Sequence, residues 1–151
     1  MSAEVKLNLS AFAPYRINVL ARLMSEQLGA AYANEGLTIS EWRVLAVVSQ
    51  EHKMAARDVV ARTPMDKMAV SRAVSSLEAK GLLCRAPGPD RRVFHLSLSG
   101  AGARIFARIA EIAQAYEAGA LSCLSEDERA SFFDMIERVE ARLTDRDRVG
   151  D

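Results

Sequence analysis

The sequence of 151 residues predicts a mainly α-helical protein, in which a helix-turn-helix and a two-stranded β-hairpin lie between long terminal helices. Three observations carry this prediction. Apolar residues recur at spacings of three and four over most of the chain, which indicates amphipathic helices. Alternation with a period of two is confined to residues 82–98,. Two short helical segments meet across Pro64, as in a helix-turn-helix,.

The first two helices are expected over 10–33 and from Ile39 to about Ser49. Gly36 suits the left-handed position that ends the first helix. Thr38 and Glu41 have the spacing of a capping box, in which each side chain accepts a hydrogen bond from the backbone of the other. The second helix therefore begins immediately after Thr38.

The helix-turn-helix is predicted over 55–80. A short helix, 55–62, ends before Pro64, because proline lacks an amide hydrogen. Asp66 is a natural N-cap for the helix 67–80, which ends at Gly81.

Residues 82–85 and 93–98 read as two strands, joined by a turn rich in proline, glycine and arginine,. A basic hairpin directly after a helix-turn-helix is the arrangement called a wing.

The C-terminal part is expected to form a long helix over 101–124 and a final helix to about residue 143, opened by a second capping box at Ser125 and Glu128,. The apolar stripes of the terminal helices exceed what a small winged domain can cover. We therefore expect residues 10–36 and 101–145 to form a dimerisation region and residues 37–100 a DNA-binding domain. A helical layer within a monomer is the alternative.

Charge is unevenly distributed along the chain. The 20 basic and 20 acidic residues cancel overall, but residues 53–92 contain nine basic and four acidic residues. This segment carries +5 and the remainder −5, which is the pattern of a module that meets phosphate locally.

The helix 67–80 has two distinct faces at 100° per residue. Val70, Val74 and Leu77 share one side, which predicts a core contact. The opposite side is small and polar apart from Met68 and Arg72, so that it can enter the major groove, where arginine pairs with guanine. The candidate DNA contacts on this helix are Lys67, Met68, Ser71, Arg72, Ser75 and Ser76.

The hairpin turn supplies further candidates for DNA contact. Arg92 is suited to a narrow, electronegative minor groove, and Asp90 can pair with it and order it. Arg85 and Arg91 would lie along the phosphates.

These residues resemble the MarR family of winged helix-turn-helix regulators. The resemblance rests on the stretches 70–74 and 77–82, on Asp90-Arg91-Arg92 with Leu98-Ser99 and Gly102, and on 14–16 and 37–45. It implies a homodimer that binds double-stranded DNA, represses a nearby gene and is released by a small, often phenolic, molecule. Met68 departs from the family, which usually has a polar residue there.

An effector pocket is expected where the dimerisation helices meet the winged domain, near Tyr15, Arg16, Trp42 and Arg43. For each of these residues a packing or salt-bridge role is the more economical interpretation. No cofactor or metal is expected.

Other classes of protein fit less well. No HExxH, GxSxG, GxxxxGK[ST] or GxGxxG motif occurs, which argues against an enzyme,. No apolar run is long enough to span a membrane. Two cysteines, Cys84 and Cys123, suit a reducing cytoplasm and leave a thiol-based redox sensor as an alternative. A dimeric scaffold protein that binds no DNA is the second alternative.

Overall fold

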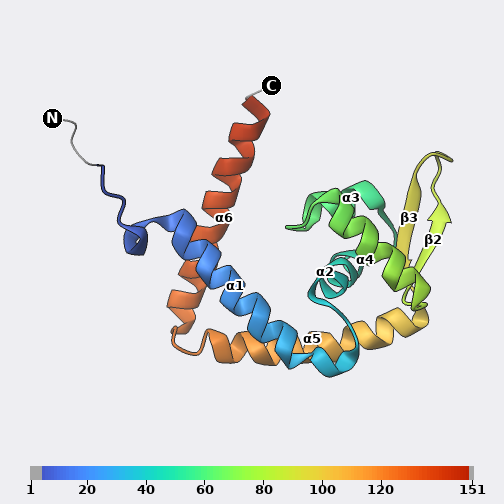
Figure 1. Ribbon diagram of the computed structural model, residues 1–151, viewed down its shortest axis with the longest axis horizontal. Helices are drawn as coiled ribbons and strands as arrows, with labels where there is room; N and C mark the ends of the chain where they lie inside the picture. The colour runs from blue at the N-terminus through green and yellow to red at the C-terminus, as the bar shows by residue number, and fades with distance from the viewer. Residues whose placement is uncertain (1–4, 150–151) are drawn as a thin grey trace. The chain divides into compact units, whose positions relative to one another are not determined.

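The computed structural model describes residues 5–149, which form two compact units divided within one helix, after Gln114. The first unit contains four α-helices, two short 3-10 helices (Leu9–Ala11 and Ala33–Glu35), a three-stranded sheet and the start of a fifth α-helix (Figure 1). Its elements are α1 (Ala13–Ala31), α2 (Ile39–Val48), β1 (Met54–Ala55), α3 (Ala56–Arg62), α4 (Lys67–Ala79), β2 (Leu83–Pro87), β3 (Phe94–Leu98) and the first part of α5 (Gly100–Ala120). The second unit contains the end of α5 and α6 (Glu126–Val149).

The caps predicted from the sequence are present. Thr38 Oγ1 accepts from the Glu41 amide at 3.1 Å, and Glu41 Oε2 accepts from the Thr38 amide at 3.0 Å. Asp66 Oδ1 accepts from the amide of Ala69 at 2.7 Å and so begins α4. Ser125 and Glu128 form the second capping box, which begins α6. Each cap satisfies backbone amides that the first helical turn leaves free.

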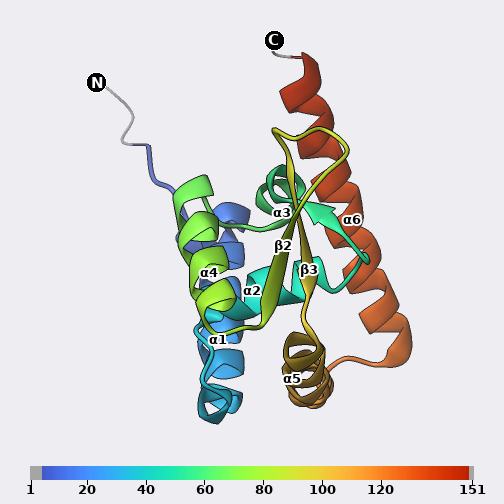
Figure 2. The ribbon, with the colours of Figure 1, turned by 90° about the vertical axis from the view of Figure 1, so that its right-hand side faces the viewer.

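The sheet has three antiparallel strands in the order β1-β3-β2, so the expectation of a two-stranded wing was incomplete. β2 and β3 form the predicted hairpin, and β1 pairs with the outer side of β3, with Met54 opposite Leu96. β1 has only two residues, too few to show an alternating pattern, and it runs directly into α3. Figure 2 shows the hairpin beside α4.

The core of the first unit lies between α2, α4 and the sheet. The predicted inner face of α4 is buried, and it packs in one apolar cluster with α2, β1, β3 and α5. Burial of this cluster fixes which face of α4 points outward. The cluster includes Val70, Ala73, Val74 and Leu77 of α4, Val44, Leu45 and Val48 of α2, Met54, Leu96, Ile105 and Ile109.

The C-terminal helices differ from their predicted ends. α5 ends at Ala120 rather than at 124, and α6 continues to Val149 rather than ending near 143. The charged segment after Leu143 contains no glycine or proline before Gly150, so nothing in it interrupts the helix,. Within the described residues no helix is both long and apolar enough to cross a membrane.

The start of α5 passes very close to the junction between α4 and β2. Ser99 holds this junction, since its hydroxyl donates to Gly81 O at 2.6 Å and its amide donates to Leu82 O at 3.0 Å. A Cβ atom on Gly102 would overlap the carbonyl oxygen of Leu82, a backbone atom that cannot move aside cheaply. The close approach therefore requires glycine at position 102.

Gly102→Ala is expected to destabilise the protein by about 1–3 kcal/mol, the usual cost of overpacking. Gly119→Ala is the matched control, because Gly119 lies in the same helix with no atom within 4 Å of an added Cβ. Its replacement should be neutral or stabilise by up to about 1 kcal/mol. Urea denaturation of both variants measures the difference, and equal effects would contradict the close approach at Gly102.

Candidate nucleic-acid interface

The outer face of α4 is exposed as the sequence predicted. Lys67, Met68, Ser71, Arg72 and Ser75 are all exposed, and the exposed fraction of Met68 is 70%. Its inner face is buried in the core, so the helix cannot turn without exposing apolar area to water,. The fold thus fixes which side chains α4 offers to a partner.

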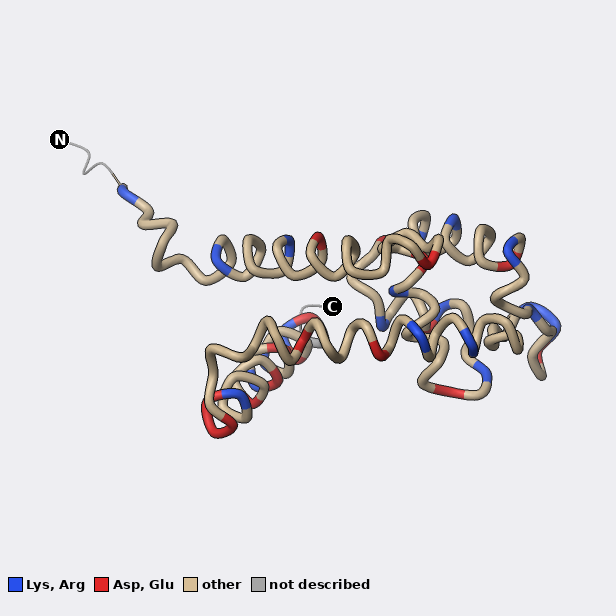
Figure 3. Tube along the Cα trace, turned by 90° about the horizontal axis from the view of Figure 1, so that it is seen from below, with Lys and Arg blue, Asp and Glu red and all other residues tan. Residues whose placement is uncertain are grey.

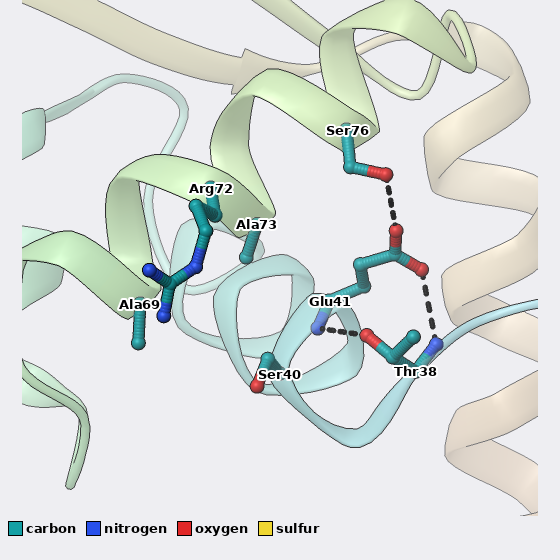
Figure 4. A pocket seen from close by; sticks show the side chains of 7 residues that line it. All are labelled: Thr38, Ser40, Glu41, Ala69, Arg72, Ala73 and Ser76. Carbon is teal, nitrogen blue, oxygen red and sulfur yellow. Dashed lines mark hydrogen bonds between the residues drawn. The ribbon is translucent and has the colours of Figure 1, made fainter.

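Arg72 lies at the edge of a small hollow between α4 and the start of α2 (Figure 4). The guanidinium group makes no hydrogen bond or ion pair with the part of the chain that the structure describes. The hollow has a volume of about 170 Å³ and is lined by Thr38, Ser40, Glu41, Ala69, Arg72, Ala73 and Ser76. An exposed arginine without an internal partner is available to an external acceptor.

Ser76 faces the protein rather than the outer side of α4. It is half-buried, and its hydroxyl donates a short hydrogen bond to Glu41 Oε1. The sequence placed Ser76 among the DNA contacts, but the structure gives its hydroxyl an internal partner.

Glu41 connects α2 and α4 through a buried carboxylate, of which only 5% is exposed. Lys80 Nζ donates to Oε2 at 2.8 Å and to Oε1 at 3.0 Å. The same ammonium group donates to the carbonyl oxygen of Gly36 at 3.0 Å. With Thr38 and Ser76, these contacts satisfy both carboxylate oxygens and join the start of α2 to the C-terminal half of α4. Figure 4 shows the contacts of Glu41 with Thr38 and Ser76.

The pKa of Glu41 is shifted by this environment. Burial raises the pKa, but the hydrogen bonds from Lys80, Ser76 and Thr38 and the charge of Lys80 outweigh it, so that the net pKa lies below the ordinary value of 4.5,. Glu41 is therefore ionised at neutral pH.

The tip of the wing is ordered by its own backbone. Gly88 N donates to Val93 O at 2.8 Å, and Val93 N donates to Asp90 O at 2.9 Å. Asp90 Oδ1 accepts from the amide of Arg92 at 3.0 Å, so Asp90 contacts the backbone of Arg92 where the sequence suggested an ion pair with its side chain. Arg91 and Arg92 are both exposed at this turn.

Arg85 lies between the wing and α4. Its Nε donates to Glu78 Oε1 at 2.6 Å, and its guanidinium carbon is 5.3 Å from the centre of the Phe94 ring. The sequence placed Arg85 along the phosphates. In the structure it connects β2 and β3 to the end of α4, which fixes the wing relative to that helix.

Charge follows the division seen in the sequence. The exposed charged residues of α4 and the wing are mostly basic, whereas the first turn of α6 carries Glu126, Asp127 and Glu128 (Figure 3).

The four residues predicted for an effector pocket do not come together within one chain. Trp42 stacks on Phe106 with ring centres 5.7 Å apart and packs at a tilt against Tyr32. Arg43 Nη2 donates to Ser25 Oγ at 3.0 Å. Tyr15 and Arg16 are exposed near the start of α1, about 14 Å along the helix axis from Ser25,.

The two cysteines considered for a thiol-based redox sensor, Cys84 and Cys123, are both free and exposed. The strand position of Cys84 had favoured a buried side chain. Among the described residues, no three His, Cys, Asp or Glu side chains gather as metal ligands would.

Sequence reasoning missed the links of Glu41 and Arg85 to α4. For Glu41 the available signal was its place in the capping box, which brings the carboxylate to the start of α2. Its contacts with Ser76 and Lys80 join residues 35 and 39 positions apart, and no local pattern reports such a pair.

Comparison with known proteins agrees with this architecture. Residues 35–92 match the model of the MarR family. A candidate regulator of the hcr operon from Thauera aromatica is 26% identical over 106 residues, which is 70% of this chain and 64% of that protein.

Solved structures share the fold. The PcaV transcriptional regulator from Streptomyces coelicolor, solved with its natural ligand, is 27% identical with a TM-score of 0.73, covering 91% of this chain and 98% of that one. A mutant of MarR from E. coli, solved with operator DNA, is 21% identical with a TM-score of 0.74, covering 82% and 89%.

The helix-turn-helix with its adjoining β-hairpin defines the class of winged helix-turn-helix proteins. Within that class, the chain is similar to the MarR family of transcriptional regulators, whose model matches residues 35–92. The fold and the family are those of regulators rather than enzymes.

Glu41→Gln is expected to destabilise the protein by about 1–3 kcal/mol at pH 7, because it removes a buried charge that accepts from Lys80 and Ser76,. The depressed pKa of Glu41 means that its charge stabilises the fold above pH 4.5 and that this contribution is lost as the pH falls through the lower folded value,. The difference between the two proteins should therefore shrink in acid.

Chemical denaturation at pH 7 and near pH 3 measures both effects. Glu128→Gln is the control, since Glu128 also belongs to a capping box and has a lowered pKa but is exposed. It should cost less than Glu41→Gln. A Glu41→Gln effect that is independent of pH would contradict the charged network.

Proposed function

We propose that the protein is a sequence-specific DNA-binding repressor that occupies a pseudo-palindromic operator as a homodimer, in the cytoplasm. The observation that carries the proposal is the outer face of α4, where Arg72 is exposed, lacks an internal partner and stands among small side chains. The MarR structure with operator DNA supports DNA as the partner.

In this proposal α4 enters the major groove. Arg72 donates two N–H groups of its guanidinium to O6 and N7 of one guanine. Ser71 and Ser75 reach base edges or phosphates, and Lys67 at the first turn contacts a phosphate. Arg91 and Arg92 at the wing tip meet the adjacent minor groove and its phosphates.

Exposed apolar side chains on α1 and on α6 support the homodimer. Ile17, Leu20 and Leu23 of α1 are 60%, 45% and 42% exposed. On α6, Val139 and Leu143 are 53% and 55% exposed. Such stripes at helical spacing are costly in water, and a second copy of the chain covers them. Two copies of α4 would then meet successive major grooves about 34 Å apart.

A small aromatic ligand is proposed as the effector that releases the DNA. The likeness to PcaV, which was solved with its natural ligand, supports an effector. Within this chain, the half-buried rings of Trp42 and Phe106 and the guanidinium of Arg43 offer aromatic and cationic contacts. Tyr15 and Arg16 would join them only from another copy or after movement of α1.

A footprint on DNA upstream of the gene, at low and high salt, tests the regulator. We expect a compact, two-fold symmetric protected region that weakens steeply with salt, because phosphate contacts release counterions. No protection at low salt, on this DNA or on random genomic DNA, would contradict DNA binding. A footprint without symmetry would contradict the dimer.

Arg72→Ala is expected to weaken operator binding by about 1–3 kcal/mol and to relax the preference for one base pair in each half-site. Arg72→Lys is the matched variant, since it keeps the charge but lacks the planar fork of donors that fits guanine. It should retain binding to random DNA and show a weaker preference. Binding curves on operators changed at single positions measure this, and an equal loss on every sequence would exclude base recognition by Arg72.

A further inference from the structure

Met68 is an apolar side chain at a place where a DNA-binding helix usually meets base edges. We infer that Met68 contacts the 5-methyl group of a thymine in each half-site and so determines part of the sequence preference. This inference rests on the proposed DNA-binding function.

The exposure of Met68 is unusual for its region. Its exposed fraction is 70%, and it is the only large apolar side chain among residues 37–92 that is this open to water. It is the second residue of α4, directly after Lys67. The N-terminal residues of a recognition helix are those that contact bases.

The chemistry of Met68 selects one feature of the groove. The 5-methyl of thymine is the apolar group that the base pairs present in the major groove, beside hydrogen-bond donors and acceptors. A thioether side chain cannot match those polar groups well, but it is flexible and packs against a methyl. Contact with a thymine would remove both apolar surfaces from water.

The position of Met68 relative to Arg72 places the thymine. The two residues are four apart on one face of α4, so their Cβ atoms are about 6 Å apart,. This corresponds to roughly two base-pair steps of about 3.4 Å. We therefore expect the thymine within two base pairs of the guanine that Arg72 contacts.

A protein partner fits this site less well than DNA. Lys67 precedes Met68 and Arg72 follows it on the same surface, within the segment that carries +5. An apolar contact between two copies here would bring like charges together without compensation. DNA supplies both the methyl group and the compensating phosphates.

The test replaces single thymines of the footprinted operator with deoxyuridine, which removes only the 5-methyl group. One position in each half-site should weaken binding of the unchanged protein by about fourfold, the factor that burial of one methyl-sized group gives. Met68→Ala should bind the original operator more weakly and show no further loss at that position. Lys67→Ala, the matched control, should bind every operator more weakly and keep the fourfold preference.

The outcomes separate this inference from the regulator proposal. If the unchanged protein binds the operator but is indifferent to every deoxyuridine, or if Met68→Ala keeps the fourfold preference, the role of Met68 is wrong and the regulator proposal stands. If the unchanged protein binds no DNA, both are wrong.

Discussion

The buried carboxylate of Glu41 is the interaction on which the candidate interface depends. It accepts from the start of α2 through Thr38 and from the C-terminal half of α4 through Ser76 and Lys80. Apolar burial alone fixes which face of α4 points inward, but it resists sliding along the helix axis only weakly, because it is not directional. Hydrogen bonds to a charged group have defined directions. They set the position of α4 along α2, and with it the place of Arg72 and Met68.

The wing depends on a second set of contacts, which also lies at the C-terminal end of α4. Arg85 joins β2 to Glu78 and lies against Phe94, and Ser99 binds the turn at Gly81. The side chains of Arg85 and Ser99 thus form hydrogen bonds within the protein. The side chains proposed to contact DNA are those without such partners on the outer face of α4 and at the wing tip. The proposal thus follows from which polar groups already have hydrogen-bond partners within the protein.

Much of the fold could be predicted from the sequence, because its signals are local. Helical periodicity and the caps at Thr38, Asp66 and Ser125 predicted where the helices begin to within about three residues, and the angular positions on α4 separated its two faces. The end of α6 was placed about six residues too early. β1 was not predicted, because a strand of two residues is too short to show an alternating pattern of apolar and polar side chains. The partners of Ser76 and Arg85 were missed because they depend on contacts between elements. The four residues expected at an effector pocket do not come together within one chain, and such a grouping depends on contacts that no local sequence pattern reports.

Hydrogen–deuterium exchange with and without operator DNA tests the central claim most directly, that α4 and the wing together form the DNA-binding face. Amide exchange in peptides covering α4 and the turn 88–93 should slow when DNA is added, with the effect lost at high salt. Peptides from the acidic first turn of α6 should not change. Protection confined to α6, or the absence of any protection under conditions where the DNA is bound, would show that α4 and the wing do not form the DNA-binding face.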